Sequence, residues 1–226
     1  MAALFLAGCA PQFRVGELQS DSQTVELDDA DAVRVEIVMG AGDLEVSGGA
    51  EELLEADFTY NVARLEPEVK YSNGTLVVRQ PDSEGMPALP GITDFRNEWD
   101  LRLNNQVPMD LSVEMGAGTS NLQLAGLSLT GLDISLGASE STIDLSGDWA
   151  QDLGVSIEAG AASLTVRLPS DIGVRVVVDR GPTVIEASGL TKDGNVYTNA
   201  AYGVSDVTLQ IDLQAGIGTI NLLEID

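Results

Sequence analysis

Apolar and polar residues alternate along most of the chain, and the alternation is interrupted at intervals by glycine. In residues 111–124, LSVEMGAGTSNLQL, apolar residues stand one, three and five positions before Gly116 and six and eight positions after it. Alternation with a period of two places one set of side chains on the buried face of a β-strand and the other set in solvent. The segment therefore predicts two half-buried strands that meet at a glycine corner.

The same arrangement recurs around five further glycines: Gly40, Gly137, Gly160, Gly181 and Gly216. From Gly116 onward these corner glycines follow one another at 21, 23, 21 and 35 residues. A repeat of strand, corner, strand and return predicts one rung of a solenoid. We therefore expect an all-β fold, a single-stranded β-solenoid with rungs of about 21 residues, in which the corner glycines adopt positive φ because they lack a Cβ.

The pattern is less regular before residue 105. We expect residues 10–105 to form an N-terminal β module and residues 106–226 to form the C-terminal solenoid repeats. In the module, Asn73-Gly74 is a strong hairpin signal. Residues 80–98 hold three prolines and two glycines and predict a long loop. In the solenoid, residues 189–206 predict an insertion whose Asp193-Gly194 is a hairpin turn.

Parallel stacking of the rungs makes a prediction about charge. The outward position two residues before the corner is occupied by Glu114, Ser135 and Glu158 in successive rungs. The position four residues before it shows the opposite alternation, with Ser112, Asp133 and Ser156. Neighbouring strands lie ~4.8 Å apart, so an uncharged residue between two carboxylates reduces their repulsion. The alternation favours parallel stacking of the rungs.

Composition narrows the function classes. The chain has 11 basic and 36 acidic residues and a net charge of -25, which would repel the phosphates of nucleic acids. It has no histidine, which removes the commonest general base and imidazole metal ligand. Its single cysteine excludes a disulfide within the chain and a thiolate zinc cluster. We expect no nucleic-acid partner and no cofactor.

That cysteine lies in the opening segment MAALFLAGCA. Leu6-Ala7-Gly8-Cys9 behind a short apolar run resembles the lipobox of bacterial lipoproteins, in which the cysteine is acylated. We expect residues 1–9 to be the remainder of a signal segment whose true start lies upstream. A lipid on Cys9 would then attach an extracytoplasmic protein to the bacterial membrane. The alternative is an apolar N-terminus with a free thiol.

A family resemblance follows from longer phrases. The stretch NEWDLRLNNQVPMDLSVEMGAGTSNLQL (97–124), the repeated glycine corners and the ending GLTKDGNVYTNAAYGVSDVTLQIDLQAGIGTINL (189–222) resemble the toast-rack family. These are bacterial envelope β-solenoids related to adhesin-like head domains and to the C-terminal domain of LiaF-type envelope-stress regulators. The resemblance implies a stack of short strands in an extracytoplasmic lipoprotein, and it transfers no catalytic residue.

Several motifs have both a chemical and a structural interpretation. The triplets 40–42 and 116–118 lack the third glycine and the following helix of a dinucleotide loop. Carboxylates could bind a hard cation such as calcium or form a solvated turn; those considered are Asp28, Asp29 and Asp31. Asp144 with Asp148 could be a glycoside-cleaving pair, although nothing singles this pair out.

Aromatic residues in or directly after the loop 80–98, and in the insertion 189–206, offer a further candidate site. They could form a recognition patch, because aromatic side chains anchor interfaces, or cover the open ends of the solenoid; they are Phe95, Trp99, Tyr197 and Tyr202.

These patterns favour a non-enzymatic function. We expect a lipid-anchored surface β-solenoid for binding, adhesion, or envelope-stress sensing and scaffolding. Its partner would be an envelope protein or a glycan of unknown identity. The alternative hypothesis is a protein that binds or cleaves surface polysaccharide with acidic residues along the solenoid face.

Overall fold

The computed structural model describes residues 15–81 and 94–225, and most of these residues lie in strands. The strands are β1 (Gln19–Val25), β2 (Val33–Ala50), β3 (Leu54–Tyr60), β4 (Glu68–Ser72), β5 (Thr75–Arg79), β6 (Asn97–Asn104), β7 (Met109–Gln123), β8 (Leu129–Asp144), β9 (Leu153–Pro169), β10 (Gly173–Arg180), β11 (Thr183–Ser188), β12 (Thr191–Asp193), β13 (Val196–Thr198) and β14 (Thr208–Ile225). A short 3-10 helix, η1, spans Ala63–Leu65. Within the described ranges, no helix is long and apolar enough to cross a membrane.

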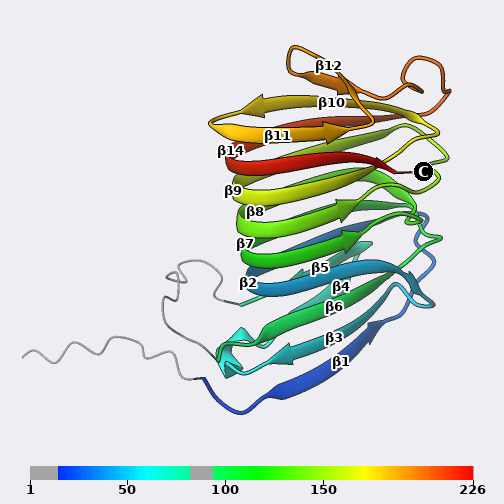
Figure 1. Cartoon of the computed structure of the whole chain (residues 1–226). Helices are drawn as coiled ribbons and strands as arrows, with labels where there is room; N and C mark the ends of the chain where they lie inside the picture. Colours follow the sequence, from blue (N-terminus) through cyan, green and yellow to red (C-terminus); the bar gives the residue numbers. More distant parts are fainter. Residues whose placement is uncertain (1–14, 82–93, 226) are drawn as a thin grey trace, which may run out of the picture.

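The long strands β2, β7, β8, β9 and β14 each bend at a corner glycine into an N-terminal and a C-terminal limb (Figure 1). Parallel pairing of these strands stacks the limbs into two layers, which we call the N-limb layer and the C-limb layer. All described strands belong to one 14-stranded sheet that is folded along the row of corners. The expected all-β stack of rungs is confirmed.

Strands without a bend complete both layers at each end. The N-limb layer begins with β4 and β5 and ends with β10, β13 and β12. The C-limb layer begins with β1, β3 and β6 and ends with β11. Strands β5 and β6 flank β2 on its two limbs, so together they form a rung whose corner is opened by the predicted loop 80–98. Of that loop, residues 82–93 lie outside the described residues.

Alternating side chains from both layers fill the space between them. Every second residue of each limb is buried, as in the pattern of β9, and the buried residues form one continuous core. This core consists mainly of Val, Leu and Ile, because narrow layers need β-branched and aliphatic side chains at strand positions. The predicted inward positions around Gly116 are buried as expected, including Val113, Met115 and Leu122.

The order of the rungs differs from the order of the sequence. The corner of Gly216 in β14 lies between the corner of Gly160 in β9 and that of Gly181, which joins β10 to β11. The chain therefore leaves β9, skips one rung position, forms β10 and β11 at the second position along, and returns through the insertion 189–206 to fill the skipped position with β14. The rungs therefore do not follow sequence order at this end of the stack.

The sheet continues without a break past residue 105. β2, which belongs to the predicted N-terminal module, pairs with β7 of the predicted solenoid over both limbs. Met39 lies opposite Met115 and Ala41 opposite Ala117, although about 76 residues separate them in the chain. Gly40 thus marks a rung of the same stack.

The two hairpin signals have different outcomes. Asn73 and Gly74 form the predicted two-residue turn between β4 and β5, with φ of 52° and 72°. In the insertion, Asp193 pairs with Val196, so the turn consists of Gly194 and Asn195, one residue later than expected. The hairpin β12–β13 extends the N-limb layer by pairing with β10.

The corner glycines are required because successive backbones approach closely, and the expected positive φ is not the reason. A Cβ on Gly137 would lie 2.2 Å from the carbonyl oxygen of Gly116, and a Cβ on Gly216 would lie 2.4 Å from that of Gly160. The corner glycines do not have positive φ; that conformation belongs to the second glycine of the triplet, as in Gly118 with φ of 128°. Close approach of successive backbones therefore explains the corner positions.

Candidate functional site

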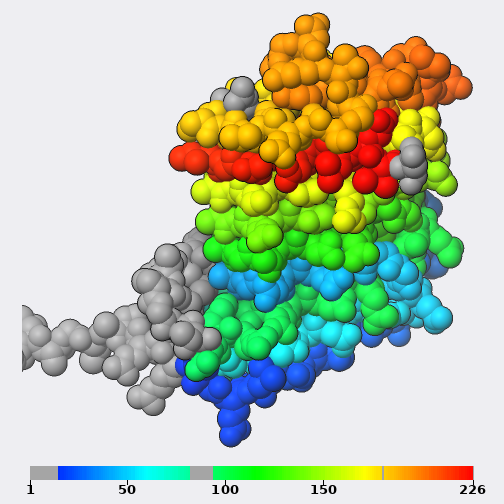
Figure 2. Space-filling view, in the orientation of Figure 1, coloured from blue at the N-terminus to red at the C-terminus, as the bar shows by residue number. Residues whose placement is uncertain are grey.

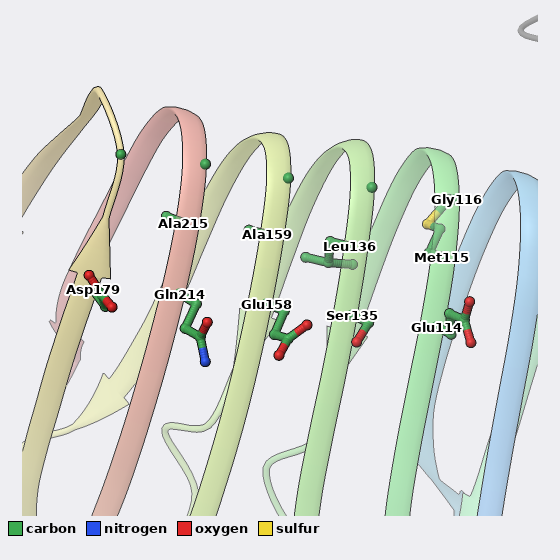
Figure 3. A pocket seen from close by; sticks show the side chains of 14 residues that line it. Glu114, Met115, Gly116, Ser135, Leu136, Glu158, Ala159, Asp179, Gln214 and Ala215 are labelled. Carbon is green, nitrogen blue, oxygen red and sulfur yellow. The ribbon is translucent and has the colours of Figure 1, made fainter.

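An open trench crosses the N-limb layer just before the row of corners (Figure 3). Its volume is about 750 Å³, and glycines from successive rungs line one side because no side chain can fit there. On the other side, outward side chains form a row that we call the charge ladder: Glu114, Ser135, Glu158, Gln214 and Asp179, in the order of the rungs.

The charge ladder places a carboxylate on every second rung. The predicted succession of Glu114, Ser135 and Glu158 is confirmed by the strand register. The insertion of β14 continues the alternation, because Gln214 separates Glu158 from Asp179. A stack in sequence order would have put those two carboxylates on adjacent strands, ~4.8 Å apart, where like charges destabilise a sheet.

A neighbouring row alternates in the opposite phase. In rung order it contains Glu36, Ser112, Asp133, Ser156 and Asp212. The two rows together give a checkerboard in which each carboxylate has uncharged cross-strand neighbours. The outer face of the N-limb layer thus carries a high negative charge while limiting repulsion between adjacent strands.

The carboxylates on the outer face of the C-limb layer are distributed differently. A groove of about 520 Å³ lies over β3, β6, β2, β7 and β8, and we call it the acidic groove after its six carboxylates: Asp43, Glu45, Asp57, Glu98, Asp100 and Glu140. These strands face the viewer in the lower half of Figure 2, which displays this face. Leu44 and the edge of buried Trp99 contribute to its floor.

Carboxylates of the acidic groove lie directly opposite one another. Asp43 is the register partner of Glu98, and Asp100 is the partner of both Glu45 and Asp57. Polar and basic neighbours offset part of the repulsion: Thr119 donates a hydrogen bond to Asp43, and Arg96 forms an ion pair with Glu98. The arrangement costs stability that the checkerboard avoids, which makes this groove the strongest candidate for a contact surface.

The four predicted aromatic residues do not form one patch. Trp99 and Tyr197 are buried in the core, with 2% and 3% of their surfaces exposed. Phe95 is half-buried beside β6, whereas Tyr202 is exposed near the opposite end of the stack. Trp99 packs edge-to-face against Phe58, and Tyr197 lies on the last strands of the N-limb layer. The structure thus separates these residues: two lie in the core and two lie at or near the surface.

The three candidate metal-binding aspartates do not converge on one site. Asp28 accepts hydrogen bonds from the Tyr71 hydroxyl at 2.6 Å and from the Ala30 amide at 3.1 Å. The hydrogen bond to this carboxylate raises the pKa of Tyr71 to about 12. Among residues 15–81 and 94–225, no group of three Asp, Glu, Cys or His side chains is placed to hold a metal ion. Asp28, Asp29 and Asp31 are therefore not brought together as a ligand set.

The proposed glycoside-cleaving pair lacks the environment of a catalytic acid. Burial raises the pKa of Asp144, but hydrogen bonds from Ser146 and the neighbouring Arg167 guanidinium outweigh burial and lower the pKa below its usual value. A general acid for glycoside cleavage needs a raised pKa. Asp148 is exposed in the loop that follows β8.

The predicted lipidation site is not among the described residues, and the acidic groove was not predicted from the sequence. Cys9 lies outside the described residues. The acidic groove was missed because its carboxylates come from segments distant in sequence, and only pairing of β3 with β6 and of β6 with β2 brings them together. The one available signal was the alternation of acidic residues in EWDLR and DLEV, which identifies outward positions but not their neighbours.

A solved structure shares the fold of this chain over nearly its whole length. A crystal structure from Clostridium sporogenes, of a protein assigned to cell adhesion by inference, is 29% identical and has a TM-score of 0.88, covering 92% of this chain and 100% of that one. A Bacteroides fragilis structure, assigned by inference to an adhesin, is 10% identical with a TM-score of 0.34 over 92% of this chain and 97% of its own. The latter likeness is too low to support an argument. No curated protein matches the chain.

The family model of the N-terminal domain of toast_rack, DUF2154, matches residues 14–167. The match extends from β1 through β8 and most of β9, and so includes the entire acidic groove. Because it covers more than half of the sequence, the chain belongs to the toast-rack family.

Proposed function

We propose that this chain is a non-enzymatic adhesion protein displayed at the cell surface, and that the acidic groove is its contact surface. The observation that carries the proposal is the likeness to the Clostridium sporogenes structure over 92% of the chain at a TM-score of 0.88. A rigid stack with an acidic groove suits binding better than turnover, because its carboxylates are held by cross-strand pairing and the pKa of Asp144, in the candidate catalytic pair, is lowered rather than raised.

The partner would carry positive charge or many hydrogen-bond donors. Six carboxylates lie on the groove surface. The neighbouring arginines pair with two of them, Arg96 with Glu98 and Arg102 with Asp57 at 3.9 Å, and Arg102 also pairs with Glu55 at 3.1 Å. Electrostatic attraction would speed the encounter with such a partner and would weaken as salt increases. An envelope protein with a basic surface or an amine-bearing glycan meets this requirement.

Attachment to the membrane through a lipid on Cys9 is a separate part of the proposal. The lipobox-like residues Leu6 to Cys9 support it. Full-length protein with Cys9→Ala should move from the membrane to the soluble fraction, and intact-mass analysis of the wild type should show an acyl adduct. A Cys9→Ala variant that stays with the membrane would contradict the anchor.

The adhesion proposal can be tested with beads that carry the purified protein. Beads are allowed to settle on intact bacterial cells, and the retained fraction is measured under flow. The groove variant combines Asp43→Asn, Glu45→Gln and Asp100→Asn, and it should reduce retention at least about fivefold, since each missing charge weakens attraction. A matched ladder variant combines Glu114→Gln and Glu158→Gln and should retain most of the adhesion.

Two results would contradict this function. Equal retention of the groove variant and the wild type would remove the groove as the contact surface. Turnover of any member of a panel of cell-wall and capsular glycans, abolished by one Asp or Glu substitution, would favour the polysaccharide-cleaving alternative.

A further inference from the structure

The ends of the two layers are completed unequally. Antiparallel strands cap the outer parallel strands in three places: β4 pairs with β5, β3 and β1 extend from β6, and β13 and β12 extend from β10. β11 is the outermost strand of the C-limb layer at the C-terminal end, and among the described strands it pairs only with β14. Within the described residues, one edge of β11 has no cap strand, and such an edge presents backbone groups with which a further strand can pair. Thr183, at the start of β11, already donates its amide hydrogen to the Gly181 carbonyl at 2.8 Å, so the edge available for pairing lies beyond it.

The side chains of β11 also depart from those of the stacked rungs. Residues 186–188 are exposed, which is consistent with a strand that has a neighbour on only one side. Val184 is 59% exposed at an outward position where the preceding rungs carry Thr219, Ser163 and Glu140. An apolar residue thus replaces polar ones on the strand whose edge is open.

A hollow adjoins this open edge. It has a volume of about 260 Å³ and lies between Ile185 of β11 and the β12–β13 hairpin, which contributes Lys192, Gly194, Asn195 and Tyr197. Tyr197 and Lys192 are register partners on the inward side of the hairpin, and the Lys192 ammonium lies 5.3 Å from the Tyr197 ring centroid. The hollow offers space for inward side chains of a strand that would lie beside β11.

We infer that β11 accepts one extended polypeptide segment from another protein, which adds as an antiparallel strand and places apolar side chains against Ile185 and Tyr197. Antiparallel addition matches all the other caps of this fold, and main-chain hydrogen bonds would supply affinity. Pockets for alternate residues would supply specificity.

The geometry favours a slender segment over a second copy of this chain. The β12–β13 hairpin extends beyond β10 and rises above β11 (Figures 1 and 2). Edge-to-edge pairing of two copies would bring two such hairpins into the same space. A net charge of -25 on each copy adds repulsion, and it favours a segment with basic rather than acidic outward residues, for example beside Glu186.

The test uses full-length protein and a panel of synthetic, fluorescein-labelled octapeptides. Each peptide alternates an apolar residue (Val, Ile, Leu or Phe) with Lys or Thr, and binding is followed by fluorescence anisotropy. Each is also made in two N-methylated forms, one methylated on the apolar residues and one on the polar residues. These forms have the same charge and side chains, but each can donate hydrogen bonds from one edge only.

At least one peptide should bind, and its two methylated forms should differ in affinity at least tenfold, because only one edge pairs with β11. Ile185→Asp should weaken binding at least tenfold. Ile217→Asp, at an exposed corner position of β14, should change it less than twofold, and thermal unfolding checks that both variants are folded.

Three results would overturn the inference: no binding by any peptide, equal binding by both methylated forms, or loss of peptide binding in the groove variant. A dimer in sedimentation velocity that Ile185→Asp dissociates would assign the edge to a second copy instead. The outcome is independent of the adhesion proposal, because bead retention depends on the acidic groove and peptide binding on β11.

Discussion

Individual glycines decide how closely the rungs can stack. Gly118 has φ of 128°, and a Cβ there would lie 1.9 Å from the carbonyl oxygen of Gly42. Gly154, in an outward position of β9, has no atom within 4 Å of such a Cβ. Two glycines of one sheet, in strands separated only by β8, therefore have opposite tolerance for a methyl group.

Gly118→Ala should lower the free energy of unfolding by at least about 2 kcal/mol, because the new methyl group meets rigid backbone and the φ angle is strained. Gly154→Ala should leave it unchanged or raise it by up to about 1 kcal/mol, since alanine reduces the entropy of the unfolded chain. Urea denaturation followed by circular dichroism measures both. Equal destabilisation by the two substitutions would contradict the close-approach argument.

Asp144 gives a prediction about pH. The folded state lowers its pKa, so its stabilisation is complete above the unfolded pKa of about 4 and is lost as pH falls through the lower folded pKa. At pH 7, Asp144→Asn should cost about 1 kcal/mol of unfolding free energy.

The difference between wild type and Asp144→Asn should shrink toward zero as the pH of the urea titrations falls below about 4. Arg167 forms an ion pair with Asp144 at 3.2 Å and helps to lower its pKa. Arg167→Gln removes this contribution and should reduce the pH dependence. A difference that stays constant from neutral to acidic pH would be inconsistent with a lowered pKa.

At the scale of elements, side-chain amides replace the missing corner of the rung formed by β5 and β6. Gln80 Oε1 accepts hydrogen bonds from the amides of Gly40 and Ala41 at 3.1 and 3.3 Å, and Asn97 donates one to the Ala41 carbonyl at 2.7 Å. In later rungs the preceding corner backbone occupies this place. The two amides therefore satisfy backbone groups of the first complete corner at the end of β5 and the start of β6.

Gln80→Leu should destabilise the protein by about 1–3 kcal/mol, because it leaves the partly buried amides of Gly40 and Ala41 without an acceptor. Gln123→Leu is the matched control: Gln123 is exposed and donates to Glu45 at 3.0 Å, and its loss should change stability by less than about 0.5 kcal/mol. Urea midpoints measure both. An unchanged midpoint for Gln80→Leu would show that the amide network does not support the corner.

The charge ladder provides a second prediction at this scale. Gln214→Glu introduces a carboxylate between Glu158 and Asp179, so that three consecutive strands carry one. Each of the two new like-charge pairs should cost about 0.2–1 kcal/mol of unfolding free energy. Added salt should recover most of the loss, while Gln214→Lys should show the opposite salt dependence. A loss that persists at about 1 M NaCl, where the Debye length is about 3 Å, would indicate a packing defect.

For the whole molecule, net charge and shape act together. A charge of -25 opposes compaction, and the stack limits the cost by spreading carboxylates over two outer faces. The wild-type urea midpoint should therefore rise as NaCl increases from about 0.02 to 0.2 M, over which the Debye length falls from roughly 20 Å to below 8 Å. A midpoint that is independent of salt would mean that the alternation already removes the repulsion.

The sequence by itself determined the local features of this protein. Alternation of apolar and polar residues identified the strands and their buried faces, and the spacing from Gly116 to Gly160 identified successive rungs. Asn73-Gly74 specified a hairpin turn. These features depend on residues a few positions apart, and backbone geometry translates them directly into conformation.

Tertiary structure alone decided which strands became neighbours. It placed Gly40 beside Gly116, inserted β14 between β9 and β10, and buried Trp99 and Tyr197, which were candidates for a surface patch. The acidic groove and the open edge of β11 also arise from this pairing. Alternation specifies which face of a strand is buried but not which strand lies beside it, because that choice depends on packing and charge summed over distant segments.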